Sequence, residues 1–251
     1  MYDWPERRDE VDAEWAAIRD CLRAHGIDAP DRLTRDFSDL HGLWRSPTLL
    51  FAQACWGPLQ QGLLQHVQVI GQPDYSAFEG GQGALYSSAI VMRPRMDGHA
   101  RPSSSLDGKM PGRTEGGVRA PTDGRPLLPL ELLRNQRLAY NSLDSMSGIL
   151  AITRDLEAIG EGLDIFSRRS ESGGHRQSIV AVAEGKADVA AIDCRSWDLA
   201  RRFEQCAAAV EVVGWTGQRK GLPYITATTT PPDTMTAMRK ALASIGALAS
   251  A

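Results

Sequence analysis

The sequence predicts an α/β protein with mainly parallel strand pairing. The chain has 251 residues, of which 42% are hydrophobic and 24% are charged, and these values are typical of a soluble chain that can bury a sizeable core. From residue 129 onward, short apolar runs typical of strands alternate with helical patterns. A regular succession of strand and helix favours parallel strands that are joined by helices.

The first 93 residues contain both kinds of pattern. Residues 5–25 predict an amphipathic helix, because Pro5 suits a first helical turn and Gly26 is a natural stop. The remaining predictions here are a short helix over residues 37–44 and strands over residues 48–54, 67–70 and 84–93.

The composition changes after residue 93. Residues 94–131 hold six of the 14 prolines and six of the 24 glycines, and they show almost no apolar periodicity before Leu127. Loops of this length in compact domains are usually functional or disordered. We therefore expect an insertion or disordered loop over residues 95–128, with weak or missing order across residues 97–123.

Periodicity returns in the last part of the chain. The predicted helices cover residues 129–133, 149–159, 175–183, 196–206 and 233–247, and the predicted strands cover residues 136–140, 164–167, 188–193, 210–213 and 224–229.

Two polar segments precede helices in this part of the chain. In NSLDSMSG, Ser145 and Ser147 lie beside Gly148, and in SGGH, His175 falls in the first helical turn. Unpaired backbone N–H groups and the helix dipole favour anions at such helix ends. Taken alone, each segment is more simply read as a helix cap or a turn, but two such segments after strands of one α/β unit favour an anion site.

The predicted strand DVAAID ends in Asp193. A carboxylate at the end of a strand can accept a hydrogen bond from a protonated oxyanion or from an amine, and it can also cap the next helix. His175 can supply a positive charge or an N–H donor to an anion. These residues favour an anion site without deciding between its possible ligands.

Several classes of function are disfavoured. The net charge of −3 argues against a nucleic-acid partner, and no apolar run approaches the roughly 18 residues of a membrane span. The four cysteines are widely scattered, so we expect free thiols and no metal site. No nucleophile or phosphate-loop motif is present, so we predict no catalytic residue and no cofactor. The start of the chain is too charged for an export signal.

At this point the sequence resembles a known family. Residues 129–202, together with MYDWPE, LYSSAIVMR and GLPYITA, resemble the PhnD-like substrate-binding proteins of phosphonate, phosphite and phosphate ABC transporters. The resemblance implies a two-lobed type II periplasmic-binding-protein fold with a mainly parallel sheet in each lobe. Lobe one would comprise residues 1–93 and 196–251, and lobe two residues 94–195. The two hinge crossings would fall near residues 91–93 and 193–196.

The resemblance also implies a ligand site between the lobes. The residues that match the family's ligand-binding positions, or that border them, are Tyr2, Asp3, Trp56, Tyr86, Ser145, Met146, Ser147, Gly148, His175, Asp193 and Arg195. Met146 stands where family members often carry a Thr hydroxyl. Arg195 stands near the place of a carboxylate that would bind an amine. An aminophosphonate is therefore a less suitable ligand than phosphate, phosphite or a phosphonate with a neutral tail.

The function implied is that of a monomeric solute-binding protein in the periplasm, which captures a small phosphorus oxyanion for an ABC importer. Its partner would be the permease of that importer. The chain starts inside the family's first ligand loop, and it shows no signal sequence. The alternative is therefore a cytoplasmic enzyme or ligand sensor on the same fold that binds a small anionic metabolite.

Overall fold

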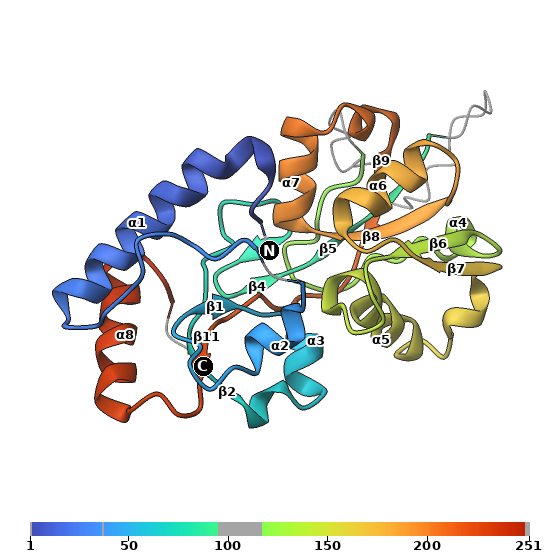
Figure 1. The fold of residues 1–251 in the computed structure, drawn as a ribbon. Coiled ribbons are helices and arrows are strands. Elements are labelled where there is room, and N and C mark those ends of the chain that lie inside the picture. Colours follow the sequence, from blue (N-terminus) through green and yellow to red (C-terminus); the bar gives the residue numbers. More distant parts are fainter. Residues whose placement is uncertain (1, 37, 95–116, 249–251) are drawn as a thin grey trace. The chain divides into compact units, whose positions relative to one another are not determined.

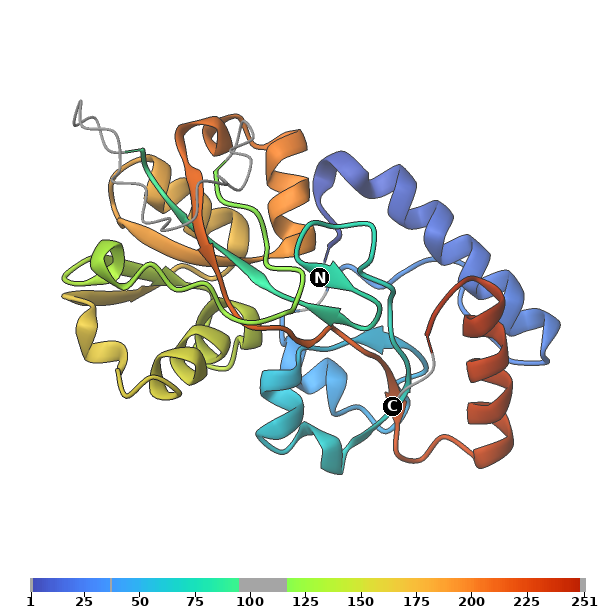
Figure 2. The same ribbon diagram turned by 180° about the vertical axis from the view of Figure 1, so that it is seen from behind.

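A computed structural model describes residues 2–36, 38–94 and 117–248 (Figures 1 and 2). The chain forms two compact units. Unit 1 comprises Met1–Ala77, Gln82–Leu85 and Lys220–Ala251, and unit 2 comprises Phe78–Gly81 and Tyr86–Arg219. The chain therefore passes from unit 1 into unit 2 at residues 85/86 and returns at residues 219/220, apart from the short excursion over residues 78–81.

Unit 2 is built on a five-stranded sheet in the order β7-β6-β8-β5-β9. Its strands are β5 (Ser88–Met92), β6 (Arg137–Tyr140), β7 (Arg168–Glu171), β8 (Val189–Asp193) and β9 (Glu211–Trp215). β6 pairs in parallel with β7 and β8, whereas β5 pairs antiparallel with both β8 and β9. The reversed strand, β5, is the one that enters unit 2 from the first crossing.

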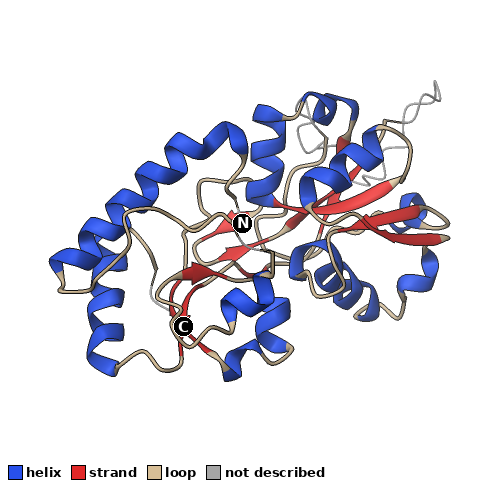
Figure 3. Ribbon diagram, in the orientation of Figure 1, coloured by secondary structure: helices blue, strands red, loops and turns tan. Residues whose placement is uncertain are grey.

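Helices cover both faces of this sheet (Figure 3). The helical segments are α4 (Leu130–Leu133), η3 (Met146–Leu150), α5 (Ala151–Glu157), η4 (Leu163–Ile165), α6 (His175–Ala183), α7 (Cys194–Phe203) and η5 (Gln205–Ala209). Ile152 and Leu156 of α5 pack against Leu138, Val189 and Ile90 in one apolar cluster. Because side chains alternate along a strand, Asp193 shares the α5 face of β8 with Val189.

Unit 1 has a smaller sheet, in the order β1-β11-β2. β11 (Tyr224–Ala227) pairs antiparallel with both β1 (Ala52–Gln53) and β2 (Val67–Gly71). The two long helices, α1 (Arg8–Ala24) and α8 (Pro232–Ser244), pack together over Ile70, whereas Trp44 and Leu59 pack against Val67 and Ile225. The remaining helical segments of unit 1 are η1 (Pro5–Arg7), α2 (Leu40–Trp44), α3 (Trp56–Gln60) and η2 (Leu63–Gln65). The short strands β3 (Gly81–Gln82), β4 (Leu85–Tyr86) and β10 (Arg219–Lys220) form a third sheet in the order β10-β4-β3.

The prediction of mainly parallel sheets is only partly right. In both units one strand runs against the others, namely β5 in unit 2 and β11 in unit 1. Each of these strands follows a crossing directly, and its insertion between two strands turns both of its pairings antiparallel. The parallel pairs are those of β6 with β7 and β8, where helices connect the strands.

The predicted lobe boundaries also differ from the compact units. The predicted crossings near residues 91–93 and 193–196 lie inside unit 2, because β5 pairs with β8 and β9 along its whole length and α7 packs against β5 and β8. The first crossing therefore comes before β5, and the second comes after β9.

The expected loop over residues 95–128 is ordered in its second part. Residues 95–116 lie outside the described residues. From Gly117 onward the segment runs along β9, where Val118 N donates to Val212 O (2.8 Å), and Leu127 and Trp215 exchange two backbone hydrogen bonds. The indole Nε1 of the buried Trp215 also donates to Val118 O at 2.8 Å. This segment covers the outer edge of β9 and binds backbone groups of Val212 and Trp215 there. The proline- and glycine-rich composition of the segment gave no sign of this docking.

Most of the other predicted elements are present, with shifted ends. The predicted strand over residues 164–167 is absent: η4 ends at Ile165, a bend follows, and the strand β7 begins at Arg168. The predicted strand over residues 48–54 is reduced to β1, and α7 begins two residues earlier than expected, at Cys194. All four cysteines are free thiols. Within the described part of the chain, no helix is long and apolar enough to cross a membrane.

The packing of residues 117–128 on β9 can be tested at Gly214. A Cβ at this position would lie 2.3 Å from Leu127 O and 2.6 Å from Pro129 Cδ. We expect Gly214→Ala to lower the free energy of unfolding by about 1–3 kcal/mol, because the packed segment must move away. Urea denaturation measures this loss. The exposed Ile159→Ala serves as control, and an equal change in both variants would contradict the tight contact.

Candidate functional site

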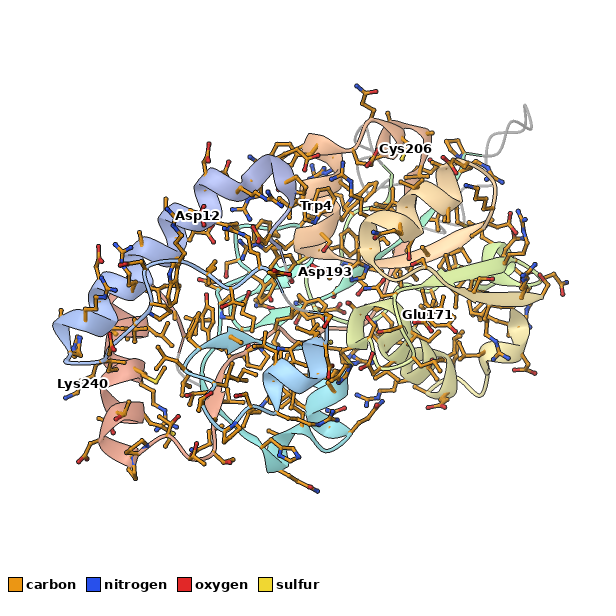
Figure 4. All side chains as sticks on the ribbon, viewed as in Figure 1. Trp4, Asp12, Glu171, Asp193, Cys206 and Lys240 are labelled. Carbon is orange, nitrogen blue, oxygen red and sulfur yellow. The ribbon has the colours of Figure 1, made fainter. Side chains whose placement is uncertain are left out.

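The candidate site lies where three parallel strands of unit 2 end. β6, β7 and β8 are hydrogen-bonded neighbours that run in the same direction, so their carboxyl ends share one edge of the sheet. The NSLDSMSG segment follows β6, the SGGH segment follows β7, and Asp193 is the last residue of β8. Figure 4 labels Glu171 at the end of β7 and Asp193 at the end of β8. Ligands of open α/β sheets usually bind at such an edge.

The first segment starts a helix with an unusually wide turn. Ser145 is its N-cap, with Oγ accepting from Gly148 N at 3.1 Å. Leu150 N donates to Ser145 O at 3.0 Å, so the first turn spans five residues instead of four. The N–H groups of Met146 and Ser147 belong to the first turn of this helix. This helix start therefore presents backbone donors beside two serine hydroxyls.

His175 lies opposite this turn, at the start of α6. Gly173 adopts a left-handed conformation, with φ of 88°, which allows the chain to turn sharply between β7 and α6. His175 Nε2 lies 2.8 Å from Ser147 Oγ and 3.1 Å from Asp193 Oδ2. One imidazole nitrogen therefore contacts groups from both neighbouring segments.

Asp193 connects this contact to the next helix. Its carboxylate is almost completely buried, and Oδ1 accepts from Ser196 N at 2.9 Å, as an N-cap of α7 does. Burial alone would raise the pKa of Asp193. The nearby His175 and the hydrogen bonds from Ser196 outweigh burial, so the pKa lies below its usual range. Asp193 is therefore ionised at neutral pH, and it both caps α7 and holds the imidazole of His175.

The protonation of His175 follows from this contact. A carboxylate oxygen at 3.1 Å accepts a hydrogen bond, so Nε2 must carry the proton. Ser, His and Asp are also the residues of hydrolase triads, in which the carboxylate binds one ring nitrogen and the serine binds the other. Here both Ser147 and Asp193 contact Nε2, so the ring cannot relay a proton from Ser147 toward Asp193. The geometry fits a fixed N–H donor better than a general base.

The structure brings together only some of the predicted site residues. Ser145, Met146, Ser147, Gly148, His175 and Asp193 meet at the edge described above, and all belong to unit 2. Met146 directs its sulfur toward Arg154 Nη1, at 3.7 Å. Arg195 lies in the first turn of α7, with its guanidinium 5.7 Å from the centre of the Phe78 ring. Tyr86, in β4, is fully buried.

Three predicted residues belong to unit 1. The Tyr2 hydroxyl lies 3.3 Å from the Tyr75 hydroxyl, and Asp3 forms an ion pair with Arg35 that holds the pKa of Asp3 below its usual range. Trp56 starts α3, and the Lys220 ammonium lies 5.3 Å from the centre of its indole ring.

Sequence reasoning passed over Asn141, although this residue is the first letter of the NSLDSMSG segment. It follows β6 directly, and its carbonyl accepts from Gly173 N at 2.9 Å, which ties the two anion-site segments together. A Cβ on Gly148 would lie 3.0 Å from both Asn141 Oδ1 and Ser145 Oγ. The sequence signal that could have identified Asn141 is its position directly after a predicted parallel strand, where ligand-binding residues are common. Within the described part of the chain, no cluster of His, Cys, Asp and Glu is arranged to hold a metal ion.

The fold is that of type II periplasmic binding proteins. A structure of PhnD1 from Prochlorococcus marinus in complex with methylphosphonate has a TM-score of 0.62 and 15% identity, over 94% of this chain and 79% of that one. A binding protein component of an ABC phosphonate transporter from Pseudomonas aeruginosa has a TM-score of 0.57 and 13% identity, over 96% and 76% of the two chains. An ancestral arginine-binding protein has a TM-score of 0.51 and 16% identity, over 93% and 80%. These likenesses establish the fold.

The family follows from the sequence itself. Residues 65–250 match the family described as the phosphonate periplasmic substrate-binding protein of ABC transporters. This match covers most of the chain, so the chain belongs to that family, and the resemblance seen in its motifs is confirmed. The match includes the edge of unit 2 described above, whereas Tyr2, Asp3 and Trp56 precede it. No curated protein matches the chain.

The role of Asp193 in stability can be tested by pH. The pKa of Asp193 is lower in the folded state than in the unfolded state, so the ionised carboxylate stabilises the folded protein. This stabilisation is complete at a pH above the unfolded-state pKa, and it is lost as the pH falls through the folded-state pKa. We expect Asp193→Asn to cost about 1–3 kcal/mol at neutral pH, since it weakens the contacts to His175 and Ser196. The difference from the wild type should shrink on acidification below about pH 4.

Chemical denaturation across a pH series measures this difference. The exposed Asp164→Asn in the same unit is the control, and it should change the free energy of unfolding by less than about 0.5 kcal/mol. A cost of Asp193→Asn that does not vary with pH would mean that the carboxylate charge is not what stabilises this junction.

Proposed function

We propose that this protein is the solute-binding component of an ABC importer, and that it captures a small phosphorus oxyanion such as phosphate, phosphite or a phosphonate. The observation that carries this proposal is the convergence of Ser147, His175 and Asp193 at the start of two helices. Ser147 Oγ and Asp193 Oδ2 both lie within 3.1 Å of His175 Nε2. Family membership supports the same ligand class.

The physical basis of capture is a set of fixed donors. The N–H groups of Met146 and Ser147, the serine hydroxyls and the helix dipole favour a negative charge at the turn before α5. His175 directs its Nε2–H at the Asp193 carboxylate, which holds the ring beside Ser147. Donors held in place by the fold lose little freedom on binding, so more of their interaction energy contributes to affinity.

The buried carboxylate of Asp193 restricts the ligand. A fully ionised oxyanion beside an ionised carboxylate is repelled more strongly than an oxyanion that keeps one proton. The site therefore favours a ligand that keeps one acidic proton. Arg195 adds positive charge at the start of α7, which disfavours a ligand with an ammonium tail. These features suit phosphate, phosphite or a phosphonate with a neutral tail better than an aminophosphonate.

Other parts of the proposal rest on the family alone. Tyr2, Asp3, Trp56 and Tyr86 are proposed as further residues of a ligand cleft between two lobes, although the Asp3 carboxylate is already engaged by Arg35. The family's role implies action in the periplasm as a monomer, with release of the ligand to a membrane permease.

The most direct test of the site is Ser147→Ala. The hydroxyl contributes a hydrogen bond to a charged ligand, so its loss should weaken methylphosphonate binding by about 1.5–3 kcal/mol. Isothermal titration calorimetry with phosphate, phosphite, methylphosphonate and sulfate measures the affinities. Ser167→Ala, an exposed serine of the same unit, should bind like the wild type. Unchanged affinity in Ser147→Ala would place the ligand elsewhere, and no binding better than millimolar by the wild type would reject the proposed function.

A further inference from the structure

Three buried polar atoms near the edge of the unit 2 sheet have no hydrogen-bond partner among the described residues. They are Ser88 Oγ, Asn141 Oδ1 and His175 Nδ1. Folded proteins leave few buried polar groups without a partner, and each such group costs about 1–3 kcal/mol. Three in one region indicate that a polar group of a ligand or an ordered water belongs there.

Asn141 is the most informative of the three. A hydroxyl can both donate and accept, and an imidazole nitrogen does either according to its protonation. An amide oxygen can only accept. An oxyanion without a proton therefore leaves Asn141 Oδ1 without a partner, even though it satisfies every donor of the helix turn.

The position of Asn141 places this acceptor at the proposed anion site. The residue joins the end of β6 to the turn before α5, and its carbonyl binds Gly173 N beside α6. Its side chain packs against Gly148, where a Cβ would lie 3.0 Å from Oδ1 and 3.1 Å from Cγ. A side chain on residue 148 would therefore press on the Asn141 amide and on the Ser145 cap at the same time.

The inward orientation of the oxygen is also the less costly one. If the amide were turned over, its NH₂ group would be buried in place of the oxygen, and buried N–H groups without a partner are rarer than buried carbonyls without one. The structure therefore leaves a buried acceptor beside the helix turn without a partner in the part of the chain that it describes.

We propose that Asn141 is a specificity-determining residue that accepts a hydrogen bond from the P–OH group of a monoprotonated phosphorus oxyanion. This inference rests on the proposed function and narrows its ligand class. The preferred ligand carries one negative charge and one acidic proton on the same phosphorus atom. An anion of the same shape and charge that lacks the proton binds less well, since it leaves the Asn141 oxygen unsatisfied.

The test compares two ligands of nearly equal shape. Methylphosphonate at mildly acidic pH is a monoanion with one P–OH group, and methanesulfonate is a monoanion with none. Titration calorimetry should show that Asn141→Ala weakens methylphosphonate binding about tenfold, the effect of one hydrogen bond, and changes methanesulfonate binding less than about twofold. Asn141→Asp keeps an acceptor oxygen, so it should weaken both ligands but preserve the preference for methylphosphonate.

Gln136→Ala is the matched control, because this amide lies at the opposite end of β6, where it donates to Arg134 O at 3.3 Å. Its affinities should equal those of the wild type, and thermal unfolding shows whether each variant is folded. Equal weakening of both ligands in Asn141→Ala would overturn the inference, since the amide would then act as a donor. Unchanged affinity for both would overturn it as well. A wild type that binds neither methylphosphonate nor phosphate would instead reject the proposed function, and this inference with it.

Discussion

The contact between Asp193 and His175 is the interaction on which the candidate site depends. The buried carboxylate ends β8, caps α7 through Ser196 N, and lies 3.1 Å from His175 Nε2. Because His175 starts α6 and lies 2.8 Å from Ser147 Oγ, one ionised group fixes the starts of three helices relative to each other. A buried charge is stable only when it is paired and hydrogen-bonded, so these partners and the charge require one another.

The architecture of unit 2 explains why these residues meet. Three adjacent parallel strands end at the same edge, and each is followed at once by a residue or turn that carries polar groups. The chain enters and leaves unit 2 beside this sheet, through β5 and after β9. Ser88 of β5 pairs in register with Asp193, and Ser88 N donates to Thr216 Oγ1 at 2.8 Å. The residues next to both crossings are thus hydrogen-bonded to each other and adjacent to the site.

Much of this could be predicted from local sequence. The glycines of SGGH, the serines of NSLDSMSG and the terminal aspartate of DVAAID are local signals, and each lies at the helix start or strand end that its pattern indicated. The Asp193 side chain does cap α7, which was one of the two readings that the sequence left open. Its second contact, with His175, joins residues 18 positions apart and depends on the pairing of β6 between β7 and β8.

Other features depend on long-range contacts that no local pattern encodes. The family resemblance implied crossings near residues 91–93 and 193–196, whereas the two compact units divide at residues 85/86 and 219/220. The order of residues 117–128 comes from hydrogen bonds to β9, about 90 residues further along the chain, and polar turn-rich composition is the same in a docked segment and in a free loop. Asn141 was passed over because an isolated amide in a turn is usually a capping or turn residue.

A crystal structure of the protein with methylphosphonate would show directly whether the ends of β6, β7 and β8 bind the ligand. We expect the phosphonate oxygens to lie within hydrogen-bonding distance of Ser147 Oγ and of the backbone N–H groups at Met146 and Ser147. We also expect Asp193 to cap α7 in the complex. Phosphonate density away from the ends of β6, β7 and β8 would contradict this assignment.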